Sequence, residues 1–555
     1  MTAEPTWKRS GWLIGISLLA IACWATIRAH LFFVNPPVWL CVDEGYAAAL
    51  AIRLFDGTHL PYVDGISIRG PLMYWIFAIA LKIGGPFNIE AIRIGAMASS
   101  LAIVLSVWSV PAALGSPLAG GFAAMFTVWS LSVGWPPVDG LAWNGESIGM
   151  PFAVTSVTLA ILALRSDRSR ATWFLLVASG ALASMAVFVK QSLAVHILWT
   201  AVCILVAGPA TTAKRLSRFA VFLAGAAVVT LFVLLPYMWT GHLGDFWYYF
   251  IQYGRDVYMA PVTFGDVMNV FNKGIIHRSP FNVLFMISGL AVLVRVFAPT
   301  SGNRNRTAAV WWLLVLGHSI LAVPSSIFTG RFFGHYFLQV DTFVSILIAT
   351  TVFGLFAPPR TPRRTSSLRG LAAVAGIAFV PILFIGQSRT SEAFRSSEWF
   401  RLMMNPAQEP VASWIREHTD ADDRIFVWGL RGDIYVNAQR RPASRFVYSL
   451  FPSGVVPWYR EPLLVQQSRV VPGSQRLLLS DLDESHCKII VDAGHSLLQR
   501  YMVQYPLLRT YIEENYELAH IISVSGEEMK SFQIPLYRRK EANGILRALP
   551  PNGAR

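Results

Sequence analysis

Two neighbouring carboxylates, Asp43 and Glu44, follow closely on the first long apolar run of the chain, Gly11–Val34. Such residues have an ordinary use, because Asp caps helices well and acidic side chains in a first helical turn complement the helix dipole. They also have a chemical use, because a carboxylate at the edge of a bilayer can accept the proton of an attacking hydroxyl group. The two uses are compatible, since a carboxylate that caps a helix is held in one orientation.

The loop that follows these carboxylates contains an ordered series of polar and aromatic residues. We expect a short amphipathic helix over Gly45–Phe55, a turn at Asp56–Gly57 and a helix lying along the membrane interface over Leu72–Ile83. The residues of this loop that could act on a substrate are Asp43, Glu44, Tyr46, Tyr62, Asp64 and Arg69. A series of this kind at the end of a membrane span needs rigid elements that hold it in place.

The elements that hold this loop are expected to be membrane-spanning helices. Of the 555 residues, 54% are hydrophobic and only 14% are charged, and the mean hydropathy is +0.48. Soluble proteins carry about 25% charged residues, so most of this chain is expected inside a bilayer. About eleven apolar runs approach the ~20 residues that cross ~30 Å of hydrocarbon. These runs are Gly11–Val34, 89–112, 116–134, 148–164, 171–189, 191–208, 219–240, 280–297, 308–325, 336–357 and 369–387.

The basic residues between these runs predict the orientation in the membrane. Lys8 and Arg9 precede the first run, and further basic clusters fall in the loops 165–170, 214–218, 295–306 and 360–369. Counting spans from a cytoplasmic N-terminus places all these clusters on the cytoplasmic side, as the positive-inside rule requires. The net charge of +14 is therefore spread over short loops and does not indicate nucleic-acid binding. The extracytoplasmic segments are then 35–88, 135–147, 241–279, 326–335 and everything after about 388.

The tail after residue 400 is far more charged and is expected to form a soluble domain. Strands that alternate with helices indicate a small α/β domain. The predicted elements are an amphipathic helix over Glu409–Thr419, buried strands over Arg424–Leu430 and Lys488–Val491, and an antiparallel pair over Ile521–Tyr537.

The predicted fold is a polytopic α-helical membrane protein with a C-terminal extracytoplasmic α/β domain. We expect a membrane core over residues 1–390, with its first extracytoplasmic loop over 35–88, and a soluble domain over 391–555. The loop Gly429–Gly432 lacks the spacing of a nucleotide-binding loop, so the soluble domain is not expected to bind nucleotides.

The series in the first loop resembles that of the GT-C superfamily of membrane glycosyltransferases. An Asp-Glu pair after the first span is followed by Tyr46, a short helix, a Pro-Tyr-x-Asp run ending at Asp64, and Arg69 before Pro-Leu-x-Tyr-Trp. The resemblance is greatest to the bacterial branch with protein O-mannosyltransferases, aminoarabinose transferases of lipid A and galacturonic-acid transferases of lipopolysaccharide core. The tail resembles some bacterial relatives at Trp428-Gly429 and Arg440–Phe446.

One position of the loop departs from the family pattern. The family often reads Lys-Pro-Pro-Leu, whereas this chain reads Arg69-Gly70-Pro71-Leu72. The positive charge is kept and moves onto a planar guanidinium, which suits a phosphate group.

The resemblance implies an enzyme that takes a sugar from a polyprenyl phosphate and inverts the anomeric centre. An acceptor hydroxyl would attack the anomeric carbon while polyprenyl phosphate leaves. Asp43 is then the expected base, and Glu44 supports it or binds sugar hydroxyls. Tyr46, Tyr62 and Asp64 are expected at the sugar or the acceptor.

A phosphate that leaves in a poorly hydrated site needs fixed cations. The expected phosphate-binding residues are Arg69, Lys190, Arg331 and His335, all on the extracytoplasmic side. Arg331 and His335 are four residues apart and would share one helical face. Lys190 has an alternative use as an interfacial lysine, and the run around His335 is also typical of the aromatic start of a span.

The resemblance also implies a second acidic residue in the second extracytoplasmic loop, which offers Asp139 and Glu146. We favour Glu146 for sugar or acceptor binding, although a charge in a first helical turn explains it equally well. Asp341 falls within a span and is expected to be buried and partnered. His196 and His318 also fall within spans but show no metal-ligand spacing, so no metal site is predicted and dependence on a divalent metal is left open.

The sequence therefore predicts an integral protein of the bacterial inner (plasma) membrane that transfers a sugar to an extracytoplasmic lipid, cell-envelope glycan or protein. The main alternative is a transporter or flippase of a lipid-linked sugar. That class would show internal repeats and helices broken at the midplane, whereas the informative polar residues here lie at one membrane edge. A non-catalytic scaffold that kept the fold is a third alternative, and replacement of Asp43 distinguishes it from an enzyme.

Overall fold

The chain folds into two compact units, and its path crosses from one to the other within the first loop. Unit 1 comprises Met1–Cys41, Ile68–Gly84 and Ile89–Met403, and unit 2 comprises Val42–Ser67, Gly85–Asn88 and Met404–Arg555. The computed structural model describes residues 6–33, 40–166, 169–206, 211–259, 262–270, 287–291, 303–330, 333–355, 378–390, 392, 408–456, 463–494, 500–526 and 529–541.

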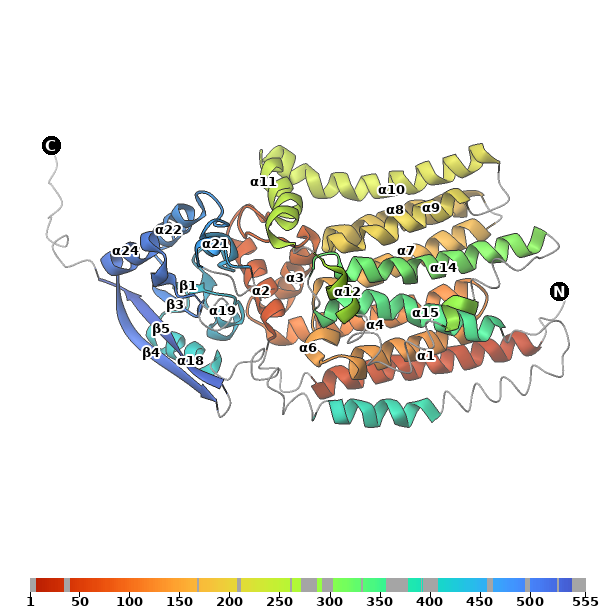
Figure 1. The fold of residues 1–555 in the computed structure, drawn as a ribbon, viewed down its shortest axis with the longest axis horizontal. Helices are drawn as coiled ribbons and strands as arrows, with labels where there is room; N and C mark the ends of the chain where they lie inside the picture. Colours follow the sequence, from red (N-terminus) through yellow and green to blue (C-terminus); the bar gives the residue numbers. More distant parts are fainter. Residues whose placement is uncertain are drawn as a thin grey trace, which may run out of the picture. The chain divides into compact units, whose positions relative to one another are not determined.

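Unit 1 is a bundle of long apolar helices that run back and forth (Figure 1). Helix α8 packs on α7, which precedes it in the chain, and on α10, which follows it after α9. The interior between the helices is filled by apolar side chains such as Ile103, Val154 and Phe343. The long helices are α1 (Thr6–Phe33), α4 (Ile89–Ala113), α5 (Pro117–Trp129), α7 (Gly145–Arg165), α8 (Ser169–Val189), α9 (Ala194–Val206), α10 (Thr212–Trp239), α14 (Asn303–Ile327) and α15 (Leu338–Leu355).

Most of the predicted spans are confirmed as helices. Within the described residues, 7 helical stretches are long and apolar enough to cross a membrane, from Ser10–Leu31 to Gly334–Val352. The shorter apolar helices Gln191–Val206 and Leu313–Ile327 match two more of the predicted runs. The predicted run 369–387 is described from residue 378 on and is helical there, whereas the run 280–297 lies largely outside the described residues.

Short helical elements gather at one end of this bundle (Figure 1). Because α7 begins where α8 ends, and α15 begins near the end of α14, the connections between these helices share that end. The basic residues Arg165 and Lys214 flank connections at the opposite end of the bundle. The short elements are α3 (Pro71–Gly84), η2 (Ser130–Gly134), α6 (Pro137–Gly140), η3 (Gln191–Leu193), α11 (Leu243–Trp247), η4 (Tyr248–Gln252), η5 (Gly254–Tyr258), α12 (Phe264–Val270) and η8 (Gly334–Phe337).

Unit 2 is built on a five-stranded mixed sheet in the order β2-β1-β3-β5-β4. Strand β1 runs parallel to β2 and β3, whereas β5 runs antiparallel to β3 and β4. The strands are β1 (Arg424–Trp428), β2 (Arg441–Pro442), β3 (Ile489–Asp492), β4 (Tyr516–Gly526) and β5 (Met529–Arg539). The helices of the C-terminal segment are α18 (Gln408–His418), α19 (Asp433–Ala438), α20 (Leu450–Ser453), α21 (Leu463–Gln467), α22 (Ser474–Glu484), η9 (Met502–Gln504) and α24 (Pro506–Asn515).

The elements predicted for the tail are confirmed, and they form an α/β domain. The amphipathic helix predicted from Glu409 is α18, and the two buried strands are β1 and β3. The antiparallel pair is longer than predicted, because β4 already begins at Tyr516. Burial explains why the sequence was informative here. All four residues of β3 are buried, and all of them except Asp492 are apolar.

The first half of the first loop packs with this C-terminal domain. Helix α2 (Val42–Arg53) contacts α19 and β2, and is followed by η1 (Leu54–Asp56). The helix predicted from Gly45 is therefore confirmed as α2, and the helix predicted over Leu72–Ile83 is confirmed as α3. Residues 42–67, which the sequence analysis grouped with the membrane core, belong to the same compact unit as the soluble domain.

Candidate functional site

The candidate site of unit 1 begins at the first turn of α7, which carries Glu146. The helix starts there because Asn144 forms a capping box with Ser147. The Asn144 side chain accepts a hydrogen bond from the Ser147 backbone at 2.9 Å, and the Ser147 hydroxyl accepts one from the Asn144 backbone at 3.0 Å. Such reciprocal bonds satisfy backbone donors that the helix itself leaves open. The cap fixes the first turn of α7, and the Glu146 side chain on this turn is only 1% exposed.

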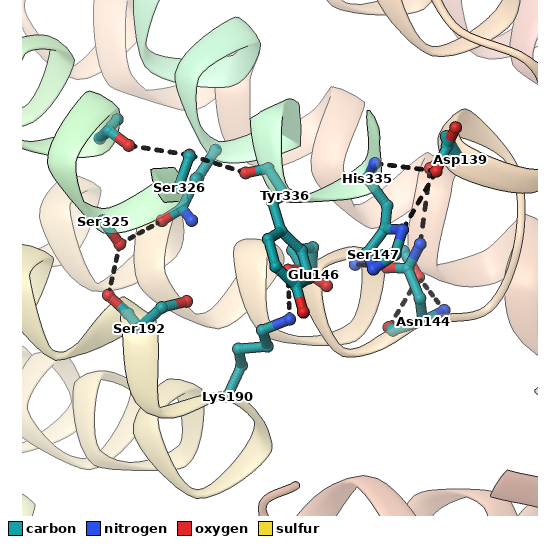
Figure 2. Close-up of polar contacts among 12 residues, drawn as sticks. Asp139, Asn144, Glu146, Ser147, Lys190, Ser192, Ser325, Ser326, His335 and Tyr336 are labelled. Atoms are coloured by element: carbon teal, nitrogen blue, oxygen red, sulfur yellow. Dashed lines mark hydrogen bonds and ion pairs between the residues drawn. The ribbon is translucent and has the colours of Figure 1, made fainter. Parts of the chain in front are cut away.

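The partner of Glu146 is Lys190, which immediately follows the last residue of α8. Lys190 has extended backbone and marks the break between α8 and η3. Its ammonium group forms an ion pair with the Glu146 carboxylate and lies 3.9 Å from the centre of the Tyr336 ring (Figure 2). An ammonium over an aromatic face is attracted by the ring quadrupole. The structure thus joins two residues that the sequence analysis had placed in separate sets.

Arg69 belongs to the same region of unit 1, because it acts electrostatically on the Tyr336 hydroxyl, as Glu146 does. The residue before it is fixed by Gln191, whose side-chain amide donates to the Ile68 carbonyl at 2.8 Å and to the Phe250 carbonyl at 3.0 Å. These two bonds tie the return of the first loop to the start of η3 and to η4.

Gly70 explains the departure of this chain from the family's Lys-Pro-Pro-Leu. A Cβ atom at Gly70 would lie 1.9 Å from the carbonyl oxygen of Phe188, in the last turn of α8. Any side chain at this position would therefore push the segment after Arg69 away from α8.

A second polar pair joins α6 to η8, the short helix before α15. The Asp139 carboxylate accepts hydrogen bonds from the backbone and from the Nδ1 atom of His335, each at 3.1 Å. Gly334 lets the two segments approach, since a Cβ there would meet Asp139 at 2.5 Å. Asp139 and His335 were both candidates from the sequence, but their pairing was not predicted. Both residues were expected in extracytoplasmic loops, and this shared side of the membrane was the only sequence signal for their contact. The fourth predicted phosphate-binding residue, Arg331, lies outside the described residues.

In unit 2, α2 carries the two carboxylates from which the sequence analysis started. Asp43 is partly exposed, whereas Glu44 is 1% exposed. Partial exposure of Asp43 in the first helical turn is compatible with proton transfer from a substrate hydroxyl. The proposed division of work between the two carboxylates stays a prediction.

The other candidates of the first loop make contacts within unit 2. Tyr46 and Tyr62 are buried, at 3% and 1% exposure, and the Tyr46 hydroxyl donates to the Ile66 carbonyl at 3.0 Å. The Asp64 carboxylate accepts from the Thr58 hydroxyl at 3.0 Å and closes the turn before it. These contacts give the three side chains a packing function, and their contact with a sugar stays a prediction.

Three ionisable residues inside the bundle of unit 1 have side-chain partners. Asp341 is 4% exposed and accepts from the Trp135 indole at 2.6 Å and from the Ser130 hydroxyl, as expected. His196 and His318 face each other across α9 and α14, with their Nδ1 atoms 3.1 Å apart. Among the described residues no group of three or more His, Cys, Asp or Glu side chains could hold a metal ion.

The geometry of unit 1 can bind an anion. Lys190 and Arg69 supply positive charge, the start of α7 supplies a helix N-terminus, and apolar helices surround them. Positive charge is worth more in such surroundings than in water, because the effective dielectric constant is lower. The partly exposed carboxylate of Asp43 in unit 2 can act as a base.

Comparison with family models finds no match to this sequence, and comparison with curated proteins finds none either. Solved structures do match. The oligosaccharyltransferase AglB from Archaeoglobus fulgidus, in complex with an inhibitory peptide and a dolichol-phosphate, has a TM-score of 0.52 at 13% identity. That match covers 97% of this chain and 75% of AglB.

ArnT from Cupriavidus metallidurans is similar over nearly its whole length. Its apo structure has a TM-score of 0.54 at 14% identity, and the match covers 95% of this chain and 98% of ArnT. The structure of ArnT bound to undecaprenyl phosphate has a TM-score of 0.53 with the same coverage. This chain therefore has the GT-C fold, with its helical membrane core and C-terminal domain, and is an integral membrane protein.

Proposed function

We propose that this protein is an inverting glycosyltransferase that moves a sugar from a polyprenyl phosphate to an extracytoplasmic hydroxyl group. The observation that carries the proposal is the Lys190 ammonium, held at one end of the bundle by Glu146 and Tyr336 with Arg69 nearby. A fixed cation in poorly hydrated surroundings is what a leaving phosphate requires. This protein shares its fold with structures that were solved with dolichol-phosphate and with undecaprenyl phosphate, and this similarity supports the same class of donor here.

The proposed reaction is a single displacement. The oxygen of an acceptor hydroxyl attacks the anomeric carbon of the donor, and the bond from that carbon to the phosphate oxygen breaks. The electron pair of that bond leaves with the phosphate, and the hydroxyl proton passes to Asp43. The products are the glycosylated acceptor and polyprenyl monophosphate, and the anomeric centre is inverted.

Charge explains why the cations of unit 1 would accelerate this reaction. The donor is a phosphodiester with one negative charge, and the product is a monophosphate that carries more. Interactions that strengthen as charge develops lower the barrier, whereas equal binding of donor and transition state does not. Lys190 and Arg69 are suited to this task, and Glu146 keeps the Lys190 ammonium in place before the donor arrives.

We place the protein in the bacterial inner membrane with a cytoplasmic N-terminus. The bundle end that carries Arg165 and Lys214 then faces the cytoplasm, in accord with the positive-inside rule. The opposite end, with Glu146 and Lys190, then faces the extracytoplasmic side, where lipid, glycan or protein acceptors are available.

Asp43→Asn tests the proposal in a strain that lacks the gene and carries each variant in its place. Mass spectrometry of membrane lipids and surface glycans should show one sugar missing from its acceptor and the sugar-linked polyprenyl phosphate accumulating. Loss of a general base costs typically 100- to 10,000-fold in rate, so Asp43→Asn should behave like the deletion despite normal membrane insertion. The matched control is Asp422→Asn, an exposed acid of unit 2.

The purified protein then separates an enzyme from a flippase. Lipid extracted from the deletion strain, which contains the accumulated donor, is supplied together with the surface glycan and the envelope proteins of that strain. A transferase releases polyprenyl monophosphate in proportion to the sugar transferred. The proposal is wrong if the wild-type protein releases no polyprenyl monophosphate, or if the Asp43→Asn protein retains sugar transfer.

A further inference from the structure

The backbone of α2 and the backbone that leads into α19 cross at two glycines of unit 2. A Cβ atom on Gly45 would lie 2.4 Å from the backbone nitrogen of Asp433, and one on Gly432 would lie 2.7 Å from the backbone nitrogen and Cα of Tyr46. Ordinary contacts of a Cβ begin at about 3.4 Å. Neither glycine has a positive φ, so close approach of the two backbones is the reason for glycine here.

The crossing point is rigid on the side of the C-terminal domain. Arg431 and Asp433, which flank Gly432, form an ion pair at 2.7 Å and are 2% and 0% exposed. A buried pair of this kind resists rearrangement, because separating the charges would leave each of them without compensation. The segment 431–433 therefore provides a fixed surface against which the first turn of α2 is packed.

Two tyrosines hold the same turn from a second direction. The rings of Tyr46 and Tyr448 are stacked with centres 3.7 Å apart and planes at 16°. The Tyr448 hydroxyl donates to the carbonyl oxygen of Val42 at 2.7 Å, and the Tyr46 hydroxyl donates to that of Ile66 at 3.0 Å. The backbone of Ile66 in turn donates to the carbonyl oxygen of Arg445 at 2.9 Å.

These contacts enclose Asp43 along the chain. Val42 precedes it and is bound by Tyr448, while Gly45 and Tyr46 follow it and are packed against the segment 431–433. Asp43 itself is partly exposed. Its place is therefore fixed by its neighbours on the helix, and its carboxylate can still reach a substrate.

We propose that Gly432 and Tyr448 of the C-terminal domain are positioning residues that set the place of the Asp43 carboxylate. The inference rests on the proposed function, because it takes Asp43 as the base. It gives the C-terminal domain an indirect part in the chemical step, through the place of the base, in addition to any contact with the acceptor.

The expected effect follows from the distances. An alanine methyl group at position 432 has to move by roughly 0.7 Å before its contact with Tyr46 becomes ordinary. A displacement of about 1 Å at a reacting group can cost on the order of 100-fold in rate. Gly432→Ala should therefore lower kcat at least 10-fold, with the KM for the donor changed less than twofold, because the donor phosphate is bound by unit 1.

The test uses the full-length protein in detergent with the lipid extract of the deletion strain as donor source. Gly432→Ala and Gly432→Val are compared with Gly11→Ala, a helical glycine with open space around it. Tyr448→Phe is a milder variant, which keeps the ring and removes the bond to Val42, and should cost about 3-fold in kcat. Hydrogen-exchange mass spectrometry of residues 42–53 reports the order of α2 independently of any activity.

The outcomes are distinguishable. Faster exchange of α2 together with a lower kcat and an unchanged KM supports the proposal. Faster exchange with full kcat overturns it, as does unchanged exchange in Gly432→Val. Should Asp43→Asn keep its activity, the proposed function fails first and the positioning inference falls with it. Should Gly432→Val not fold, Gly432→Ala and Tyr448→Phe still decide the question.

Discussion

The two units hold their candidate residues in opposite ways. At the site end of unit 1, charged side chains are held by other polar side chains, as in Glu146 with Lys190 and Asp139 with His335. In unit 2, α2 is held by a glycine crossing and by neutral tyrosines around Asp43. One arrangement is ionic and the other depends on shape.

This difference matches what each part has to do in the proposed reaction. An ion pair can exchange one anion for another, so Lys190 can turn from Glu146 towards a donor phosphate with little movement of the backbone. A crossing of two backbone segments has no such alternative partner, because the two segments can either stay in contact or separate. Unit 1 is thus suited to binding a ligand that comes and goes, and unit 2 to keeping a reactive group in one place.

The largest effect on the ionic side is expected from Lys190→Ala. Loss of one group that stabilises developing negative charge typically lowers kcat by about 100- to 1,000-fold. Lys190→Arg should recover part of this, because a guanidinium also binds phosphate. The measurement is the rate of polyprenyl monophosphate release, and the matched control is Lys214→Ala, an exposed lysine at the other end of the bundle.

A double variant separates catalysis from stability in this prediction. Lys190→Ala alone leaves Glu146 buried without its cation, which typically costs about 3 to 5 kcal/mol. Lys190→Met combined with Glu146→Gln removes both charges, so it should restore folding but not transfer. An active double variant would show that the ionic pair contributes to stability alone.

An intermediate effect is expected from Asp492, a buried acid of unit 2 that is held by backbone groups instead of a cation. It accepts from the Met502 backbone at 2.7 Å, and burial raises the pKa of its carboxyl from 3.8 to about 7. Between about pH 4 and pH 7 the folded protein therefore binds one more proton than the unfolded chain, and the free energy of unfolding falls as the pH rises. At about 1.4 kcal/mol for each pKa unit, the fall is roughly 4 kcal/mol.

Asp492→Asn should remove this dependence on pH. Hydrogen-exchange mass spectrometry of β3, corrected for the intrinsic exchange rate, measures the opening free energy between pH 5 and pH 8. Protection in the wild type should decrease across this range, and protection in Asp492→Asn should stay level. The control is Asp483→Asn, which changes a half-exposed acid of the same unit. A variant that kept the wild-type slope would contradict the prediction.

The smallest effect is expected from Arg441, whose guanidinium is exposed although its partner Asp56 is only 8% exposed. The two groups are 2.6 Å apart, but Arg441 is 45% exposed and Asp56 also binds Arg424 at 2.9 Å. Exposed pairs contribute about 0 to 1 kcal/mol, so Arg441→Gln should shift the denaturation midpoint of unit 2 little. Arg431→Gln breaks the buried pair with Asp433 instead, and should cost about 3 kcal/mol or more. Equal effects of the two variants would show that burial does not determine how much each ion pair contributes to stability.

The elements of the fold could be read from the sequence wherever one local pattern was sufficient. Apolar runs of spanning length predicted α4, α7 and α10, and alternating or continuous apolar residues predicted β1 and β3. Their signals are local, because a helix that crosses a bilayer must be apolar along its own length. The break at Lys190 was predicted for the same reason, since a charged residue between two apolar runs marks the end of each.

The pairings of the candidate residues could not be read in this way. Asp139 lies 196 residues from His335, and nothing in either local pattern selects the other. Glu146 and Lys190 were both predicted at the site, but as ligands of different parts of the substrate. Which acid neutralises which base depends on the packing of α6, α7, α8 and α15 against one another, and only the tertiary structure contains that information.

The sequence by itself determined that this is a polytopic membrane protein with a charged α/β tail, and it marked the first loop as the candidate site. It did so because hydropathy, charge placement and the ordered series from Asp43 to Arg69 are properties of short segments. Only the tertiary structure decided that this loop is divided between two units, and that Gly45 meets Gly432. The physical reason is that a glycine in the sequence does not indicate which distant segment will pack against it, so a close approach of two backbones leaves no local pattern.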